Sequence, residues 1–155
     1  IELLKKSCFE LDRVILETSQ KLSGGKEFEN FVNSGKPKIQ TVLQVDDDPI
    51  QLALNKKILK KFNNEIEVIS FLNAEEALEF LQRESVNIIF LDINMPVMNG
   101  WEFLEALEIR NQIIQVFILS SSIDPSDKQK SREYANVRGF FSKPLLLEDI
   151  NKTFS

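Results

Sequence analysis

From Lys38 onward, short apolar runs alternate with longer amphipathic stretches, and this alternation restricts the fold more than any other feature of the chain. Each apolar run has the length of a buried strand, and each amphipathic stretch can form a helix that crosses from one strand to the next. Five such pairs predict an α/β domain in which a parallel sheet carries helices on both faces, with right-handed crossovers. We expect the strands at residues 41–45, 66–70, 87–91, 116–119 and 137–141.

Helix-starting signals follow several of these strands. Asp48 and Asp124 each precede a proline, which combines an N-cap carboxylate with a residue suited to the first helical position. Asn73 is followed by Glu76, the spacing of a reciprocal capping pair. The expected strand order is the flavodoxin-like 2-1-3-4-5, which places the first and third strands side by side. We expect the helices to end near residues 62, 83, 109, 134 and 153.

Residues 1–37 differ from the rest in pattern and predict a helical extension followed by a linker, with the main domain at residues 38–155. Residues 1–22 predict an N-terminal α-helix, because apolar or small side chains recur at steps of three and four and form an a/d seam of about three heptads. Ser23-Gly24-Gly25 then stops the helix. The seam predicts either a homodimer through this helix or packing of the helix on the domain that follows. Its members are Ile1, Leu4, Cys8, Leu11, Ile15, Thr18 and Leu22.

Composition excludes several classes of protein. Of the 155 residues 43% are hydrophobic, enough for one packed domain plus an extension. The net charge of −5 argues against direct nucleic-acid binding, and no apolar stretch has the length of a membrane span. A lone Cys8 cannot form an internal disulfide, which fits a cytoplasmic location. The chain has no histidine, which excludes a Ser-His-Asp hydrolase, a His-ligated metal site and a phosphohistidine relay within it.

Carboxylates follow two of the predicted strands at the point where each strand ends. Asp46, Asp47 and Asp48 follow the first strand, and Asp92 follows the third. Because the expected order makes these strands neighbours, their carboxyl ends meet at the edge where such sheets bind ligands. Clustered carboxylates repel one another unless a cation joins them, so we expect a divalent cation at Asp46, Asp47 and Asp92, with Asp48 as a helix cap.

Four segments, in this order, resemble the receiver domain of bacterial two-component response regulators, and the similarity runs from about Ile39 to the C-terminus. One such segment alone would be a weak signal, whereas four at strand ends make a strong one. The resemblance implies a phosphorylatable signalling switch rather than a metabolic enzyme. The segments are Val45-Asp46-Asp47-Asp48-Pro49, Leu91-Asp92-Ile93-Asn94-Met95-Pro96-Val97-Met98-Asn99-Gly100, Leu119-Ser120-Ser121 and Ser142-Lys143-Pro144-Leu145.

The resemblance implies a specific reaction at the matching positions. Asp92 would accept a phosphoryl group from a histidine kinase or a phosphotransfer protein and form an acyl phosphate. Mg²⁺ would be bound directly by Asp47 and Asp92, through water by Asp46, and by the main-chain carbonyl of Asn94.

The resemblance also implies a switch that signals to a downstream protein. Lys143, preceding a proline with which the family forms a cis bond, would neutralise the phosphoryl group. Ser120 would hydrogen-bond a phosphoryl oxygen, and the ring of Phe140 would rotate inward, which changes the surface of the domain's fourth helix, fifth strand and fifth helix. Asn94 and Ser122 match the positions that tune hydrolysis of the acyl phosphate.

Three other functions remain open from the residues. A pseudo-receiver would bind partners without phosphorylation, although the acidic, hydroxyl and lysine positions are all filled. A phosphatase of the haloacid dehalogenase type needs a second aspartate where Asn94 stands, and a flavodoxin needs a glycine-rich phosphate loop where Asp46-Asp47-Asp48 stands. Gln44 occupies a position where the receiver family normally has an aliphatic residue, so its amide must find a partner or face an edge.

Overall fold

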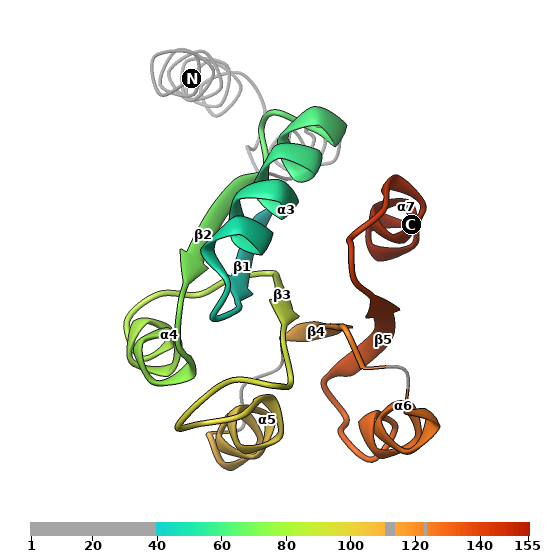
Figure 1. The fold of residues 1–155 in the computed structure, drawn as a ribbon. Coiled ribbons are helices and arrows are strands. Elements are labelled where there is room, and N and C mark those ends of the chain that lie inside the picture. The colour runs from blue at the N-terminus through green and yellow to red at the C-terminus, as the bar shows by residue number, and fades with distance from the viewer. Residues whose placement is uncertain (1–39, 111–113, 123) are drawn as a thin grey trace, which may run out of the picture. The chain divides into compact units, whose positions relative to one another are not determined.

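The computed structural model describes residues 40–110, 114–122 and 124–155, and the strands among them form one five-stranded sheet (Figure 1). Neighbouring strands all pair in parallel, in the order β2-β1-β3-β4-β5. This confirms the predicted flavodoxin-like order, and each strand end lies within one residue of its expected position. The strands are β1 (Thr41–Val45), β2 (Glu67–Phe71), β3 (Ile88–Leu91), β4 (Gln115–Ser120) and β5 (Val137–Ser142).

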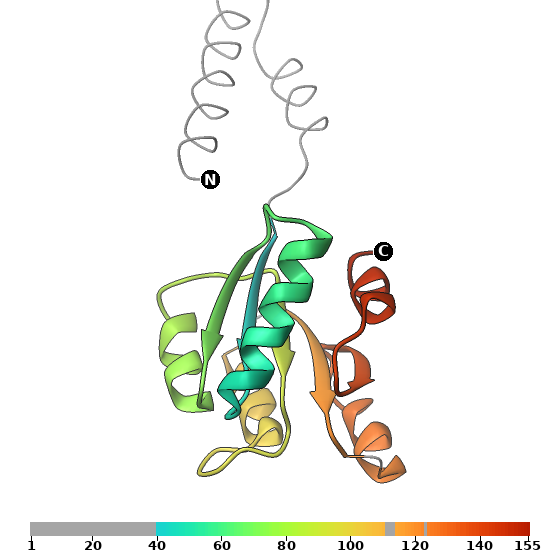
Figure 2. The same ribbon diagram turned by 45° about the horizontal axis from the view of Figure 1, so that its top comes forward.

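Helices cover both faces of the sheet, as a doubly wound fold requires. α3 and α7 lie on one face, and α4, α5 and α6 lie on the other (Figures 1 and 2). The bounds of the helices are α3 (Pro49–Phe62), α4 (Ala74–Leu81), α5 (Gly100–Ile109), α6 (Pro125–Ser131) and α7 (Leu147–Phe154).

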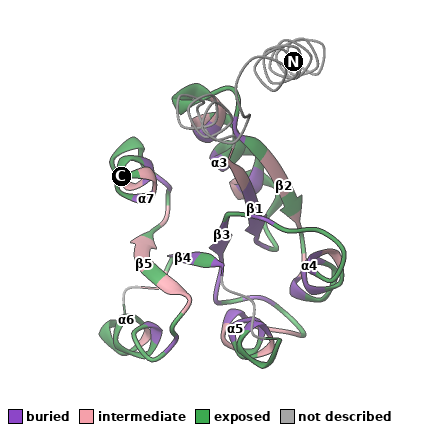
Figure 3. Cartoon of the chain, turned by 180° about the vertical axis from the view of Figure 1, so that it is seen from behind, coloured by how far each residue is buried: buried purple, intermediate pink, exposed green. Residues whose placement is uncertain are grey.

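Apolar side chains fill the space between the sheet and each layer of helices. Along β1, Leu43 and Val45 pack with side chains of α4 and α5, whereas Val42 packs with side chains of α3 and α7. Every residue of β3 is buried (Figure 3). Full burial of one such side chain contributes about 1.5–3 kcal/mol. The two central strands, whose ends carry the predicted carboxylates, are therefore held by apolar packing on both faces.

Polar caps define where the helices begin. The side chains of Asp48, Asn73 and Asp124 each accept a hydrogen bond from a main-chain N–H in the first turn of α3, α4 and α6, as predicted. Asn99 caps α5 in the same way. These bonds satisfy N–H groups that have no partner within their own helix, so each helix has a fixed start.

Two helices end earlier than the sequence predicts. α4 ends at Leu81 and α6 at Ser131, before the expected ends near residues 83 and 134. Beyond these points the N–H groups of Gln82 and Arg132 bond to carbonyls three residues back. That spacing is tighter than the α-helical one, so the chain leaves α-helical geometry at the final turn.

Gln44 is buried in β1, and within the described part of the chain only the nitrogen of its amide has hydrogen-bond partners. Its Nε2 donates to the carbonyl of Leu52 in α3 over 2.9 Å and to Ser70 Oγ in β2 over 2.8 Å. Its Oε1 has no hydrogen-bond partner among the described residues. A glutamine at this position, where the family normally has an aliphatic residue, therefore links β1 to β2 and α3 by hydrogen bonds. Its oxygen is a buried acceptor that lacks a partner among the described residues, which is unfavourable.

Residues 1–39 lie outside the described residues. The expected N-terminal helix with its a/d seam, the boundary near Lys38 and the homodimer through that helix therefore stay predictions. Within the part of the chain that the structure describes, no helix combines the length and the apolar character needed to cross a bilayer.

Candidate functional site

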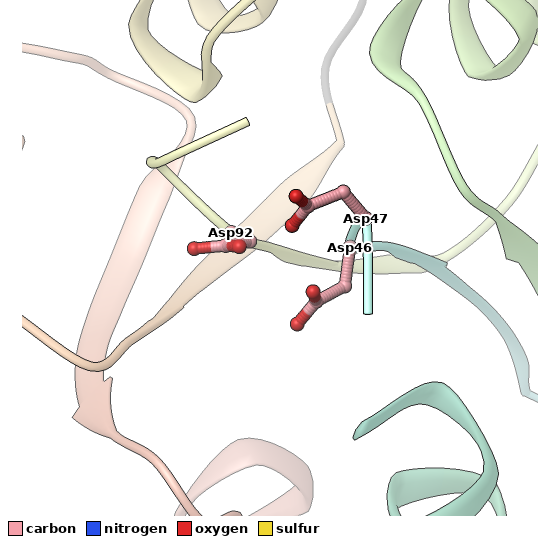
Figure 4. Close-up of side chains that lie close together, drawn as sticks. All are labelled: Asp46, Asp47 and Asp92. Atoms are coloured by element: carbon pink, nitrogen blue, oxygen red, sulfur yellow. The ribbon is translucent and has the colours of Figure 1, made fainter. Parts of the chain in front are cut away.

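Three carboxylates gather at the ends of the central strands. Val45 pairs with Leu91 in the β1–β3 register, so the next residues along each strand, Asp46 and Asp92, emerge beside each other. Oxygens of Asp46, Asp47 and Asp92 all lie within 4.8 Å of one another (Figure 4). The structure thus brings together the three aspartates that the sequence singled out.

The three carboxylates differ in exposure and in hydrogen bonding. Asp46 and Asp92 are buried, whereas Asp47 is exposed. Asp46 Oδ1 accepts from the N–H of Asp48 over 2.9 Å, and Asp92 Oδ1 accepts from the N–H of Asn94 over 3.2 Å. Each of these bonds fixes the rotation of a buried carboxylate and directs its other oxygen into the site.

Lys143 reaches the site from the residue that follows β5. Its main-chain N–H donates to the carbonyl of Ser120 over 2.9 Å, and the Lys143–Pro144 peptide bond is cis. Its Nζ lies 2.7 Å from Asp46 Oδ2 and 3.2 Å from Asp92 Oδ2. One ammonium therefore bridges the two buried carboxylates, as expected of a lysine that faces the site.

Burial and charge make Asp92 an unusual carboxyl group. Burial, together with the negative charge of Asp46, raises the pKa of Asp92 from 3.8 to about 6, although Lys143 opposes this rise. Burial alone would lower the pKa of Lys143, but hydrogen bonds and attraction from Asp46 and Asp92 outweigh it and raise that pKa. The lysine thus stays charged, and the ionisation of Asp92 depends on its burial and on the charges of Asp46 and Lys143.

The loop after Asp92 approaches the strand end closely. A Cβ added at Gly100 would lie 2.6 Å from the carbonyl oxygen of Asp92 and 2.7 Å from the Cα of Ile93, so only glycine fits there. Val97 has a φ of 68°, a left-handed conformation that is a real outlier for a β-branched residue. Asn94 is exposed, and the contact between it and Asp92 is made by its main-chain N–H.

The two serines after β4 have different surroundings. Ser120 is fully buried, and its Oγ accepts from the N–H of Ser122 over 3.0 Å. The hydroxyl of Ser122 donates to Asp127 Oδ2 over 2.7 Å and accepts from the N–H of Asp124 over 3.2 Å. The Ser122 hydroxyl is thus bound at the start of α6. Asp127 was not predicted as a site residue. Its place in the first turn of a helix starting at Pro125 could have indicated a hydrogen bond to a residue just before that helix.

Phe140 and Phe141 lie on opposite faces of β5, as the alternation of a strand requires. Phe140 is partly buried against the apolar cluster that includes α4 and α5. Phe141 stacks on Phe117 with ring centroids 5.7 Å apart. Phe140 therefore lies on the face of the sheet shared with α5 and Tyr134, and its role in a switch stays a prediction.

Residues 42–155 match the family described as response regulator receiver domain. The transcriptional regulatory protein FlgR of Helicobacter pylori is 32% identical over 118 residues, which cover 72% of this chain and 29% of FlgR. The transcriptional regulatory protein MalR of Bacillus subtilis is 30% identical over 115 residues, 74% of this chain and 48% of MalR. The chain thus spans less than half the length of either relative.

Solved structures give the same result. A two-component response regulator from Cytophaga hutchinsonii is 32% identical and superposes with a TM-score of 0.70, covering 76% of this chain and 96% of that protein. The chemotaxis protein CheY4 of Vibrio cholerae is 29% identical with a TM-score of 0.66, covering 75% of this chain and 96% of CheY4. The chain belongs to the response regulator receiver domain family.

Proposed function

We propose that this chain is a phosphorylatable signalling switch in which Asp92 accepts a phosphoryl group from a phosphohistidine of a histidine kinase or a phosphotransfer protein. The observation that carries this proposal is the position of Asp92. Its buried carboxylate lies within 4.8 Å of oxygens of Asp46 and Asp47, and within 3.2 Å of the ammonium of Lys143. Burying several charged groups together is costly unless each has a partner. A divalent cation and a phosphoryl group would supply those partners.

The proposed reaction is a displacement at phosphorus. An oxygen of the Asp92 carboxylate bonds to phosphorus, the bond between phosphorus and the histidine nitrogen breaks, and its electron pair returns to the imidazole. Charge neutralisation and positioning supply most of the catalysis in phosphoryl transfer. Lys143 Nζ, 3.2 Å from Asp92 Oδ2, is placed to neutralise a phosphoryl oxygen.

Asp46, Asp47 and Asp92 fit the ligand set of Mg²⁺. They offer carboxylate oxygens, the hard donors that Mg²⁺ prefers, within 4.8 Å of one another. We propose that Asp47 and Asp92 bind the ion directly, that Asp46 binds through water and that the main-chain carbonyl of Asn94 contributes a further oxygen. The bound ion would supply positive charge to the phosphoryl oxygens and offset the repulsion between the carboxylates.

The output of the switch is a changed surface for a downstream protein. Ser120 would turn its hydroxyl toward the phosphoryl group, and Phe140 would rotate into the space that this movement opens. The affected surface comprises α6, β5 and α7. Relatives with similar domains include proteins named as transcriptional regulators, and one is named hybrid signal transduction histidine kinase C of Dictyostelium discoideum. For this chain we propose a cytoplasmic location, a histidine kinase or phosphotransfer protein as the phosphoryl donor, and a downstream protein as the target.

Intact-mass measurement with acetyl phosphate and Mg²⁺ tests the proposal. The wild-type chain should gain the mass of one phosphoryl group, and Asp92→Asn should gain none. Asp48→Asn is the matched control, because Asp48 lies in the same acidic run but caps α3, and asparagine also caps. Labelling of Asp92→Asn would place the acceptor elsewhere. A wild-type chain that is never labelled would favour the pseudo-receiver alternative.

A further inference from the structure

The segment that leads from β4 into α6 contains a hydrogen-bonded cluster that includes Asp127, a residue to which the proposed function gives no role. Ser122 Oγ donates to Asp127 Oδ2 over 2.7 Å and accepts from the N–H of Asp124 over 3.2 Å. The N–H of Ser122 donates to Ser120 Oγ over 3.0 Å. The cluster therefore connects Ser120, which is fully buried beside the site, to the first turn of α6.

The bond to Asp127 determines what the Ser122 hydroxyl can do. A serine hydroxyl has one proton to donate, and here that proton points to a carboxylate, which is a stronger acceptor than a neutral group. One lone pair of the same oxygen accepts the N–H of Asp124. The hydroxyl is thus engaged as donor by Asp127 of α6 and as acceptor by the cap residue Asp124, only two positions along the chain from Ser120.

We propose that Asp127 is a positioning residue that holds the Ser122 hydroxyl at the start of α6 and withholds it from a phosphoryl group on Asp92. The role rests on the proposed function, since it requires that Asp92 is phosphorylated. Its effect is to lengthen the lifetime of the acyl phosphate. Asp127 acts through Ser122 and does not touch the reacting atoms.

The step that this arrangement slows is hydrolysis. A water oxygen bonds to phosphorus, the bond from phosphorus to the Asp92 oxygen breaks with its electron pair returning to the carboxylate, and the water loses one proton to solvent. A hydroxyl released from Asp127 can accept a hydrogen bond from this water and orient it. With Asp127 in place, the water lacks this partner.

Decay of the phosphorylated form, followed by intact mass after removal of acetyl phosphate, tests the proposal. Asp127→Ala should decay about fivefold faster than wild type, which corresponds to about 1 kcal/mol. Asp127→Asn keeps an oxygen that can accept from Ser122 and should restore most of the wild-type lifetime. In the background of Ser122→Ala, replacing Asp127 by alanine should have no further effect, because no hydroxyl remains to be released.

A second variant tests whether faster decay comes merely from loosening the start of α6. Asp124→Ala removes the cap of α6, which is the bond from Asp124 Oδ1 to the N–H of Ser126 over 2.9 Å, but leaves Asp127 in place. It should not reproduce the faster decay. The proposal is wrong if Asp127→Ala decays at the wild-type rate, if its effect persists without the Ser122 hydroxyl, or if Asp124→Ala has the same effect.

The same experiment separates this role from the proposed function. A wild-type chain that gains no mass removes the proposed function and this role with it. A chain that is labelled on Asp92 and decays equally fast with and without Asp127 removes this role alone. Asp127 is partly exposed in a helix of seven residues, so its replacement leaves the apolar core intact.

Discussion

Lys143 Nζ lies closer to Asp46 than to Asp92, at 2.7 Å against 3.2 Å. The lysine therefore compensates Asp46 more fully while remaining within reach of Asp92, the proposed phosphoryl acceptor. Each carboxylate also accepts one main-chain N–H, over 2.9 Å at Asp46 and over 3.2 Å at Asp92, so Asp46 has the shorter contact of both kinds. The consequence is an Asp92 whose negative charge is only partly compensated, which agrees with its raised pKa.

Replacing Lys143 tests this distribution of charge. Lys143→Met removes the cation that lowers the pKa of Asp92, so that pKa should rise above 6, as measured by a ¹³C NMR titration of the Asp92 carboxyl group in metal-free protein. The free energy of unfolding should fall by about 1–3 kcal/mol at neutral pH, because two buried carboxylates lose their shared partner. Mg²⁺ binding should persist.

The matched control for Lys143 is Lys152→Met. Lys152 pairs with Glu148 on the surface of α7 over 3.5 Å, and both side chains are exposed. Its replacement should change the unfolding free energy by less than about 0.5 kcal/mol. If both replacements changed the free energy of unfolding equally, the ion pairs of Lys143 at the site would contribute no more to stability than a surface ion pair.

Asp92 should make the stability of the metal-free protein depend on pH. Its pKa in the folded state is about 6, above the value of 3.8 for an ordinary aspartate, so the folded state binds the proton more tightly. Its contribution is therefore fully present below about pH 4 and is lost as pH rises through 6. At pH 8, Asp92→Asn should be more stable than wild type by about 1–3 kcal/mol, and this gain should shrink at pH 5.

Urea unfolding of both proteins in excess chelator, at pH 5 and at pH 8, measures this difference. Added Mg²⁺ should stabilise wild type and reverse the order at pH 8, because the ion binds the folded carboxylate cluster. A difference between the two proteins that is the same at both pH values would contradict the proposed ionisation of Asp92.

Asp47 should be the aspartate whose replacement weakens Mg²⁺ binding with the least damage to the fold. It is exposed, and it belongs to the cluster of three carboxylates. Asp47→Asn should lower Mg²⁺ affinity about tenfold, or about 1.4 kcal/mol, in a calorimetric titration. Asp48→Asn should bind as wild type does. Loss of affinity in both variants would mean that the general negative charge, rather than the cluster, attracts the ion.

Val97 offers a test of backbone strain near the site. Its φ of 68° is costly for a β-branched residue, and the residue is 89% exposed, so little packing is lost on replacement. Val97→Gly should raise the free energy of unfolding by about 1 kcal/mol, because glycine adopts this conformation without a steric penalty. Val97→Ala should recover less. Thermal unfolding measures both, and a destabilised glycine variant would show that the valine has a packing role.

The fold and the three aspartates could be predicted because each follows from a local pattern. Apolar runs predicted the strands, and parallel pairing of neighbouring strands then placed Asp46 beside Asp92 without any knowledge of side-chain contacts. The hydrogen bond between Ser122 and Asp127 could not be predicted in this way, because it depends on side-chain rotation. Helix ends at Leu81 and Ser131 also escaped prediction, since a tighter last turn costs little and leaves no clear signal in the sequence.

Gln44 shows where pattern reasoning stops for a different reason. The sequence predicted that its amide needs a partner, and the structure supplies Leu52 and Ser70 for the nitrogen but none for the oxygen among the described residues. Which groups meet a buried side chain depends on the packing of three elements at once. The sequence can reveal that a polar residue lies in a buried strand, but it cannot reveal which groups that residue contacts.

Because Val45 pairs with Leu91, the proposed phosphorylation would also test whether β1 and β3 are correctly aligned. Side chains of a strand alternate between faces, so a slip of one residue between β1 and β3 would turn either Asp46 or Asp92 toward the opposite layer of helices. A molecule misfolded in this way could keep its helix content and much of its compactness. It would nonetheless fail to assemble the anionic cluster, and a chemical assay would detect an error that circular dichroism would miss.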